Sequence, residues 1–157
     1  MEVKKKKKSS FNIVRATPGN ILEVYEMYKR VWREKSVNPV PAEDQQKVYY
    51  WKLLEELGNP GHVVLLIKRG TRYLGFVHGV VAPADPGHAP RMFVKIIHVL
   101  DSKRKHGGGK MPADELAFLA GLLGVKKFDF MCDDDLVEYW AKKRNAKKVA
   151  NYMTFEV

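Results

Sequence analysis

The sequence has only one cysteine, Cys132, among its 157 residues. A single thiol excludes an internal disulfide and a zinc site built from several cysteines. Long apolar runs are also missing, because none approaches the roughly 20 residues that a membrane-spanning helix needs. No signal peptide is expected either, since the lysines of residues 4–8 lead into two serines and not into an apolar stretch. We therefore expect a cytoplasmic protein with no membrane partner.

Acidic residues are few relative to basic ones, 18 against 28, which gives the chain a net charge of +10. Residues 1–10 carry five lysines and one glutamate, so the rest of the chain keeps a charge of +6. This surplus favours polyanionic partners, among them coenzyme A and nucleic acid, and disfavours a strongly basic acceptor. We expect residues 1–10 to form a basic, disordered tail, which could be a nucleic-acid-binding arm or only a frayed terminus.

Residues 11–157 are expected to form a single domain, because the length and the 45% hydrophobic composition suffice for a globular core. Helices are expected to begin at Thr17–Pro18 and at Pro41–Ala42, and the pair Gly70–Thr71 predicts a two-residue hairpin turn. The pattern further predicts strands at residues 11–16, 62–68, 73–81, 92–100, 127–131 and within 149–157, and helices at residues 109–123 and 136–143. This order predicts an α/β fold with a mixed, mostly antiparallel twisted sheet and about four flanking helices.

A basic, glycine-rich turn occupies residues 104–110, between an expected strand and an expected helix. Three consecutive glycines let the backbone turn sharply and bring its N–H groups close to a ligand. The helix that begins there adds unpaired amides and the positive end of its dipole, so the turn predicts an anion site with phosphate as the guest. A solvated basic turn is the alternative. A P-loop is excluded because Met111, and not Ser or Thr, follows Lys110.

The segment Arg104-x-x-Gly107-x-Gly109 resembles the acyl-coenzyme A signature of the GNAT N-acetyltransferase superfamily, Arg/Gln-x-x-Gly-x-Gly/Ala between a strand and a helix. Downstream, Asp133-x-x-Leu136-x-x-Tyr139-Trp140 is similar to the family's Asn-x-x-Ala-x-x-Phe-Tyr. The resemblance implies a single GNAT-like domain with splayed central strands. It also implies direct transfer of an acetyl group from acetyl-CoA to an amine of a small molecule, a peptide or an aminoacyl group, without a metal. The subunit number stays open between a monomer and a homodimer.

The resemblance also implies a cofactor site made largely of backbone groups. The pantetheine arm would lie between the fourth and fifth strands, and the pyrophosphate would lie on the amides of the glycine turn. The implied cofactor-binding residues are Ile97, His98, Val99, Arg104, Lys105, His106, Gly107, Gly108, Gly109, Lys110, Asp133 and Trp140. A backbone N–H of the splayed strand would stabilise the oxyanion.

The catalytic side chains depart from the family pattern. Its thiolate-protonating tyrosine aligns with Trp140, whose indole N–H is a poor acid, so the neighbouring Tyr139 is the catalytic candidate. His98 could be the base, although a regular strand would turn it away from the faces of Ile97 and Val99. Trp140 leaves open a catalytically inactive acyl-CoA binder, and the basic charge leaves open a nucleic-acid-binding module.

Two further groups of side chains have alternative interpretations. The family's acceptor pocket is lined by the link between the first two helices, so Tyr49, Tyr50 and Trp51 could contact an acceptor or be buried against the sheet. The histidines at positions 62, 78 and 88 are far apart in the sequence, and no metal site is predicted from them.

Overall fold

The computed structural model describes residues 12–34, 40–82, 90–99 and 124–130, together with Ala117, Gly121 and Lys142. In chain order the elements are β1 (Asn12–Arg15), the 3-10 helix η1 (Pro18–Asn20), α1 (Ile21–Glu34), α2 (Glu43–Gly58), β2 (His62–Arg69), β3 (Arg72–Ala82), β4 (Arg91–Val99) and β5 (Lys127–Phe130). Two of the four predicted α-helices are therefore described. Ala117, Gly121 and Lys142 lie within the other two predicted helices and are helical. The rest of those helices and residues 149–157 lie outside the described part.

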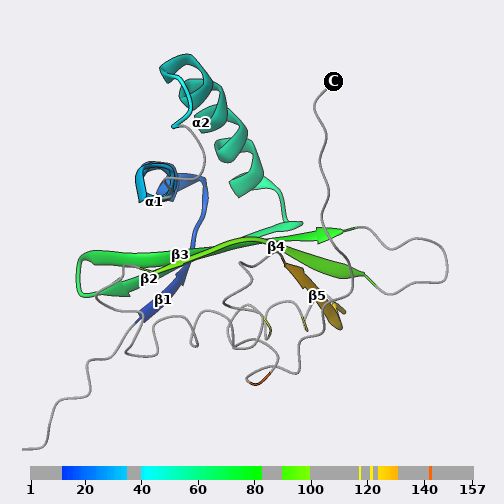
Figure 1. Ribbon diagram of the computed structural model, residues 1–157. Coiled ribbons are helices and arrows are strands. Elements are labelled where there is room, and N and C mark those ends of the chain that lie inside the picture. Colours follow the sequence, from blue (N-terminus) through cyan, green and yellow to red (C-terminus); the bar gives the residue numbers. More distant parts are fainter. Residues whose placement is uncertain are drawn as a thin grey trace, which may run out of the picture.

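The five strands form one sheet in the order β1-β2-β3-β4-β5 (Figure 1). The first three pairings are antiparallel and the β4–β5 pairing is parallel, which confirms the predicted mixed, mostly antiparallel sheet. The turn between β2 and β3 consists of Gly70 and Thr71, as predicted. Gly70 has a φ of +59°, a left-handed conformation that glycine adopts without a steric penalty.

Both described α-helices lie on the same face of the sheet (Figure 1). α1 buries a stripe at helical spacing, Val24, Met27, Tyr28 and Val31, because residues three and four apart share one side of a helix. This stripe packs with Leu53 of α2 on Val64, Leu66 and Phe76 of the sheet. Within the described residues, neither helix is long and apolar enough to cross a membrane.

The opposite face of the sheet has a second apolar cluster. Alternate residues of β2 to β4 point there, and the cluster consists of Val63, Leu65, Val77, Met92, Val94 and Val125, with Ile97, Phe128 and Phe130 packed against it. Gly124 precedes Val125 with a φ of +76°, and its N–H donates to the Gly121 carbonyl. This left-handed glycine ends the helix that precedes β5, as its position in the sequence predicts.

A β-bulge interrupts β4 at Lys95. Across the β3–β4 pair, His78 is opposite Ile96 and Gly79 is opposite Val94, so Lys95 is the extra residue. The bulge puts two successive side chains on the helix-bearing face, because Lys95 reaches Glu56 of α2 while Ile96 packs against the core beneath α1. The described β4–β5 pairs run from Arg91–Lys127 to Val94–Phe130, so the bulge directly follows the last described pair.

Candidate functional site

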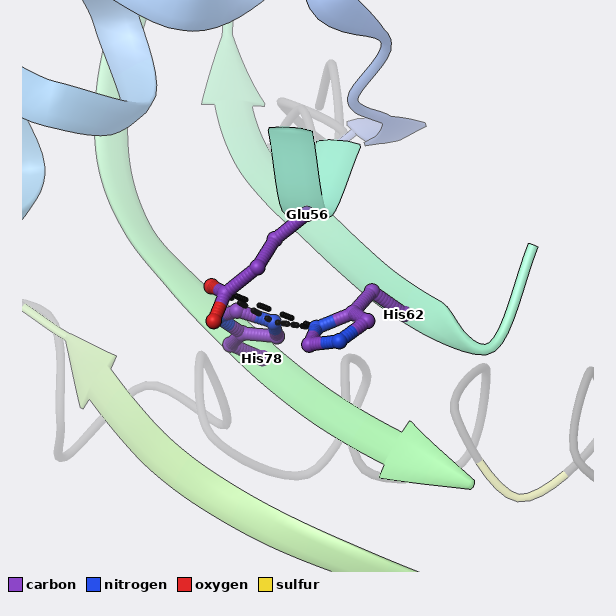
Figure 2. A group of neighbouring side chains, drawn as sticks. All are labelled: Glu56, His62 and His78. Atoms are coloured by element: carbon purple, nitrogen blue, oxygen red, sulfur yellow. Dashed lines mark hydrogen bonds and ion pairs between the residues drawn. The ribbon is translucent and has the colours of Figure 1, made fainter. Parts of the chain in front are cut away.

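Polar side chains gather on the sheet beneath the end of α2. Glu56 comes from α2, His62 begins β2, His78 lies in the middle of β3, and Lys95 is the bulge residue of β4. Figure 2 shows the Glu56 carboxylate reaching from the helix toward the two imidazoles. These residues are named here the bulge cluster. It interrupts a face of the sheet that is otherwise packed with apolar and aromatic side chains.

The chain path explains why the acid and the two histidines meet. His62 pairs with Val80 and His78 pairs with Val64, so the two histidines are diagonal neighbours on one face of the sheet. Glu56 lies in the last turn of α2, and a short link then turns the chain into β2. The Asn59 side chain accepts a hydrogen bond from the Gly61 N–H at 2.8 Å, and the Asn59 carbonyl accepts one from the His62 N–H at 3.0 Å. These bonds hold Glu56 over the beginning of β2.

The distances within the bulge cluster are short. His62 Nδ1 lies 3.0 Å from His78 Nε2, a hydrogen-bond distance. Glu56 Oε2 lies 4.0 Å from His62 Nδ1 and 3.9 Å from His78 Nε2. Lys95 Nζ donates to Glu56, 3.2 Å from Oε1 and 3.3 Å from Oε2. On its other side, His78 Nδ1 lies 2.7 Å from the Tyr28 hydroxyl of α1. The cluster therefore connects both helices to three strands.

Burial sets the protonation of these groups. His78 is fully buried, and burial together with the charge of Lys95 lowers its pKa to about 3. Burial also lowers the pKa of His62, although the nearby Glu56 carboxylate opposes this. Both imidazoles are thus neutral at pH 7, each with one N–H and one lone pair. Burial and the neighbouring Tyr49 raise the pKa of Tyr28, so its hydroxyl stays protonated.

An open groove on α2 lies beside the bulge cluster. The Tyr49 ring is 5.2 Å from the Tyr28 ring, and Lys52 Nζ lies 4.0 Å from Glu56 Oε1. The groove has a volume of about 260 Å³ and is lined by Asp44, Gln45, Val48, Tyr49 and Lys52. A molecule in this groove would touch side chains that contact the cluster.

Comparisons with known proteins identify the fold. No protein-family model matches the chain. No curated protein matches it either. Solved structures do match. A predicted acetyltransferase from Clostridium acetobutylicum, solved with acetyl-CoA, has a TM-score of 0.79 at 13% identity, over 94% of this chain and 96% of that one. The chain has the GNAT fold.

Two aminoglycoside-related structures share this fold. An aminoglycoside acetyltransferase from an uncultured soil metagenomic sample, in complex with sisomicin, has a TM-score of 0.73 at 12% identity, covering 94% of this chain and 96% of its own. AAC(6')-Iy, in complex with a bisubstrate analogue of CoA and acetylneamine, also has a TM-score of 0.73 at 12% identity, covering 95% and 99%. At such identities the comparison establishes the fold and not the substrate. The GNAT fold predicted from the glycine turn is confirmed.

Only part of the predicted GNAT site lies in the described residues. Ile97 packs in the second apolar cluster, whereas His98 is buried on the helix-bearing face with its ring 6.3 Å from Phe76. The predicted alternation therefore holds, because the bulge at Lys95 comes before these residues. Val99 ends β4. The other predicted site residues lie outside the described part of the chain: Arg104, Lys105, His106, Gly107, Gly108, Gly109, Lys110, Asp133, Tyr139 and Trp140.

The structure adds to one expectation from the sequence and corrects another. The histidines are far apart in the sequence and predict no metal site, yet the fold places donor atoms of His62, His78 and Glu56 within 4.8 Å of one another. Of the two interpretations of the aromatic run, burial holds for Tyr49 and Tyr50, which are partly buried, but is wrong for Trp51, which is 67% exposed. Trp51 follows these tyrosines by less than a turn and points away from the sheet.

Proposed function

We propose that this chain is an acetyl-CoA-dependent N-acetyltransferase that passes the acetyl group directly to an amine. The observation that carries the proposal is the GNAT fold, which the chain shares over 94% of its length with a predicted acetyltransferase solved with acetyl-CoA. On this fold, the bulge of β4 brings Lys95 to a cluster of titratable side chains.

The proposed cofactor site begins on β4 and ends at the glycine turn. The pantetheine amides would pair with the backbone of Ile97, His98 and Val99. The pyrophosphate would bind the amides of residues 105–110, with Arg104 contributing charge, and Asp133 and Trp140 would lie nearby. Because such a site uses backbone groups, the glycines matter more than any single charged side chain.

The proposed reaction forms a C–N bond and breaks the thioester C–S bond. Holding the thioester beside the amine lowers the barrier by proximity, and a backbone N–H near the bulge would bind the oxyanion. The amine must lose a proton, and the leaving thiolate must gain one. We assign the first proton to His62, the neutral and partly exposed imidazole of the bulge cluster, and the second to Tyr139 as the acid. His98, buried beside Phe76, is less accessible to an acceptor.

The groove on α2 is the proposed acceptor site. Its Tyr49 side approaches Tyr28 and its Lys52 side approaches Glu56, so an acceptor amine there would lie near the cluster. Asp44 supplies a negative charge for a cationic amine. The basic charge of the whole chain disfavours a polycationic acceptor, so a small amine with few charges is the preferred class.

Calorimetry with acetyl-CoA on the full-length protein tests the cofactor step. We expect binding, and we expect Gly107→Glu to weaken it about tenfold or more, because the variant puts a side chain and a negative charge where phosphate would bind. The matched control is Gly121→Ala, at an exposed helical position where an added Cβ meets nothing within 4 Å. A folded wild-type sample that shows no heat at high micromolar acetyl-CoA would overturn the proposal.

Release of free coenzyme A in the presence of an amine panel tests the transfer step. The panel should include aminoglycosides, polyamines, small monoamines and peptides. Tight cofactor binding with no thiol release on any amine would favour the inactive acyl-CoA binder that Trp140 suggests. Salt-sensitive binding to DNA or RNA that survives deletion of residues 1–10 would instead favour a nucleic-acid-binding module.

A further inference from the structure

We infer that Glu56, His62 and His78 form a binding site for a divalent transition metal ion, with Zn²⁺ as the natural probe. Two imidazoles and one carboxylate are a donor set that Zn²⁺ accepts. The three residues come from α2, β2 and β3, and one donor atom of each lies within 4.8 Å of the other two (Figure 2). Acetyl transfer as proposed above does not use a metal, so this site is an addition to that function.

The three donor atoms lie close enough together for one ion to reach all of them. His62 Nδ1, His78 Nε2 and Glu56 Oε2 form a triangle with sides of 3.0, 3.9 and 4.0 Å. A point at equal distance from all three lies about 2.1 Å from each, which matches usual Zn–N and Zn–O bond lengths. That point lies in the plane of the three donors, and a tetrahedral ion lies above such a plane. Small side-chain movements are therefore needed, a widening of the short contact between the two imidazole nitrogens and an approach of Glu56 Oε2 to both.

The lone pairs point to the same conclusion. If His78 Nδ1–H donates to the Tyr28 oxygen at 2.7 Å, His78 Nε2 has its lone pair on the side of His62. Such a hydrogen bond on the far nitrogen is how proteins orient a metal-binding histidine. In the absence of an ion, the hydrogen bond between the two imidazoles contains one proton, which is on His62 Nδ1. A bound ion would displace this proton to His62 Nε2, so both rings would stay neutral.

Lys95 sets the charge of the site. Its Nζ lies 3.2 Å from Glu56 Oε1 and 3.3 Å from Oε2, so it shares the carboxylate with the inferred ion. An ion on Oε2 leaves Oε1 to the ammonium group. The positive charge of Lys95 nevertheless opposes a second cation nearby. This opposition distinguishes an ion site from a purely structural network, because removing Lys95 should strengthen metal binding.

Access to the site comes from the side of His62. The side chains of Glu56 and His62 are 10% and 15% exposed, whereas His78 is fully buried. Three protein donors leave the fourth position of a tetrahedral ion to water. A site with one partly exposed wall can exchange its ion with solvent, so metal-free protein can be prepared with a chelator and reloaded.

The test is a titration of chelator-treated, full-length protein with Zn²⁺ by calorimetry, repeated with Co²⁺ and visible absorption. We expect one ion per chain and a Co²⁺ spectrum of a four-coordinate site. His62→Gln and Glu56→Gln should each weaken binding about tenfold or more, because each removes a ligand. Lys95→Met should strengthen it. The matched control is Glu55→Gln, which removes an exposed carboxylate of α2 next to Glu56 that does not belong to the three-donor group.

Circular dichroism checks that each variant is folded, and His62 and Lys95 are both partly exposed positions where folding should be retained. The inference is overturned if folded wild-type protein takes up no Zn²⁺. It is equally overturned if His62→Gln and Glu56→Gln bind as well as Glu55→Gln, because the ion then sits elsewhere. An unchanged or weakened affinity in Lys95→Met would identify the cluster as a salt-bridged network that holds α2 on the sheet.

Discussion

The Tyr28 hydroxyl of α1 lies 2.7 Å from Nδ1 of His78 on β3, in the centre of the core beneath the helices. Both groups are buried, and the Tyr28 ring also packs against Phe76, with ring centroids 4.9 Å apart. The hydrogen bond satisfies two polar groups that would be costly to bury without partners. It also fixes the orientation of an imidazole whose other nitrogen faces the bulge cluster.

Tyr28→Phe tests this hydrogen bond. The variant keeps the aromatic packing but leaves His78 Nδ1 buried without a partner, so the free energy of unfolding should fall by about 1–3 kcal/mol. Urea denaturation measures the change. Tyr25→Phe is the control, because the Tyr25 ring packs on Trp32 and Tyr50 and its hydroxyl makes no hydrogen bond within the described residues. Equal effects of the two variants would show that the Tyr28–His78 bond adds nothing to stability.

The pair between Glu56 and Lys95 should be energetically coupled. Glu56 is 10% exposed and Lys95 is 26% exposed, so solvent screens this pair less than a surface pair. In a double-mutant cycle with Glu56→Gln and Lys95→Met, measured by urea denaturation without metal, we expect a coupling of about 1–3 kcal/mol.

The control cycle uses Glu43 and Lys47, an exposed pair on α2 with its charged atoms 3.1 Å apart. Exposed pairs at this helical spacing couple by only about 0.3–0.5 kcal/mol. A Glu56–Lys95 coupling no larger than that of the control pair would contradict the view that this ion pair anchors α2 to the bulge.

Stability should fall with acidification because of His78. Its pKa is about 3 in the folded protein and about 6.5 when exposed in the unfolded chain, so the unfolded state binds more protons between these values. The favourable contribution is complete above pH 6.5 and is lost as the pH falls toward 3, by at most about 1.4 kcal/mol per pH unit. The polar and charged groups that face this ring are Glu56, His62, Lys95 and Tyr28.

The measurement is nuclear magnetic resonance of the histidine rings in metal-free protein. We expect the His78 ring to stay neutral at pH 5, while exposed histidines become protonated. Unfolding experiments at pH 7 and pH 5 should show the matching loss of stability. A His78 signal that titrates near pH 6.5 would contradict both the burial and the proposed contribution.

Much of the sheet could be predicted from the sequence, whereas the bulge cluster could not. Alternation and β-branched residues predicted β1 to β5 to within a residue or two, and Gly70–Thr71 predicted the hairpin turn. The face of the sheet on which a side chain lies depends on the strand register. The β2–β3 register contains a shift between Ile67 and Lys68 that no residue pattern predicts. Without that shift, His62 would share a face with Gly79 and Val77 and not with His78.

Glu56 is the residue for which the sequence did contain a signal. It lies three residues after Leu53, on the edge of the apolar stripe that Leu53 and Leu57 define on α2. Burying a carboxylate beside such a stripe is costly unless it has a partner, so its presence predicts a polar partner at that place. Which partner it finds depends on the bulge at Lys95, and an irregularity of one strand follows from tertiary packing and not from local propensity.

Zn²⁺ should inhibit acetyl transfer if the two proposals describe the same cluster. A bound ion takes the His62 Nδ1 lone pair, and the displaced proton occupies Nε2, so His62 can no longer accept a proton from the amine. We expect the rate of coenzyme A release to fall as the site fills and to return when a chelator removes the ion. Acetyl-CoA affinity should stay unchanged, because the cofactor site uses β4 and the glycine turn. Full activity with one ion bound per chain would show that the amine proton leaves through a group other than His62, while leaving the metal site itself intact.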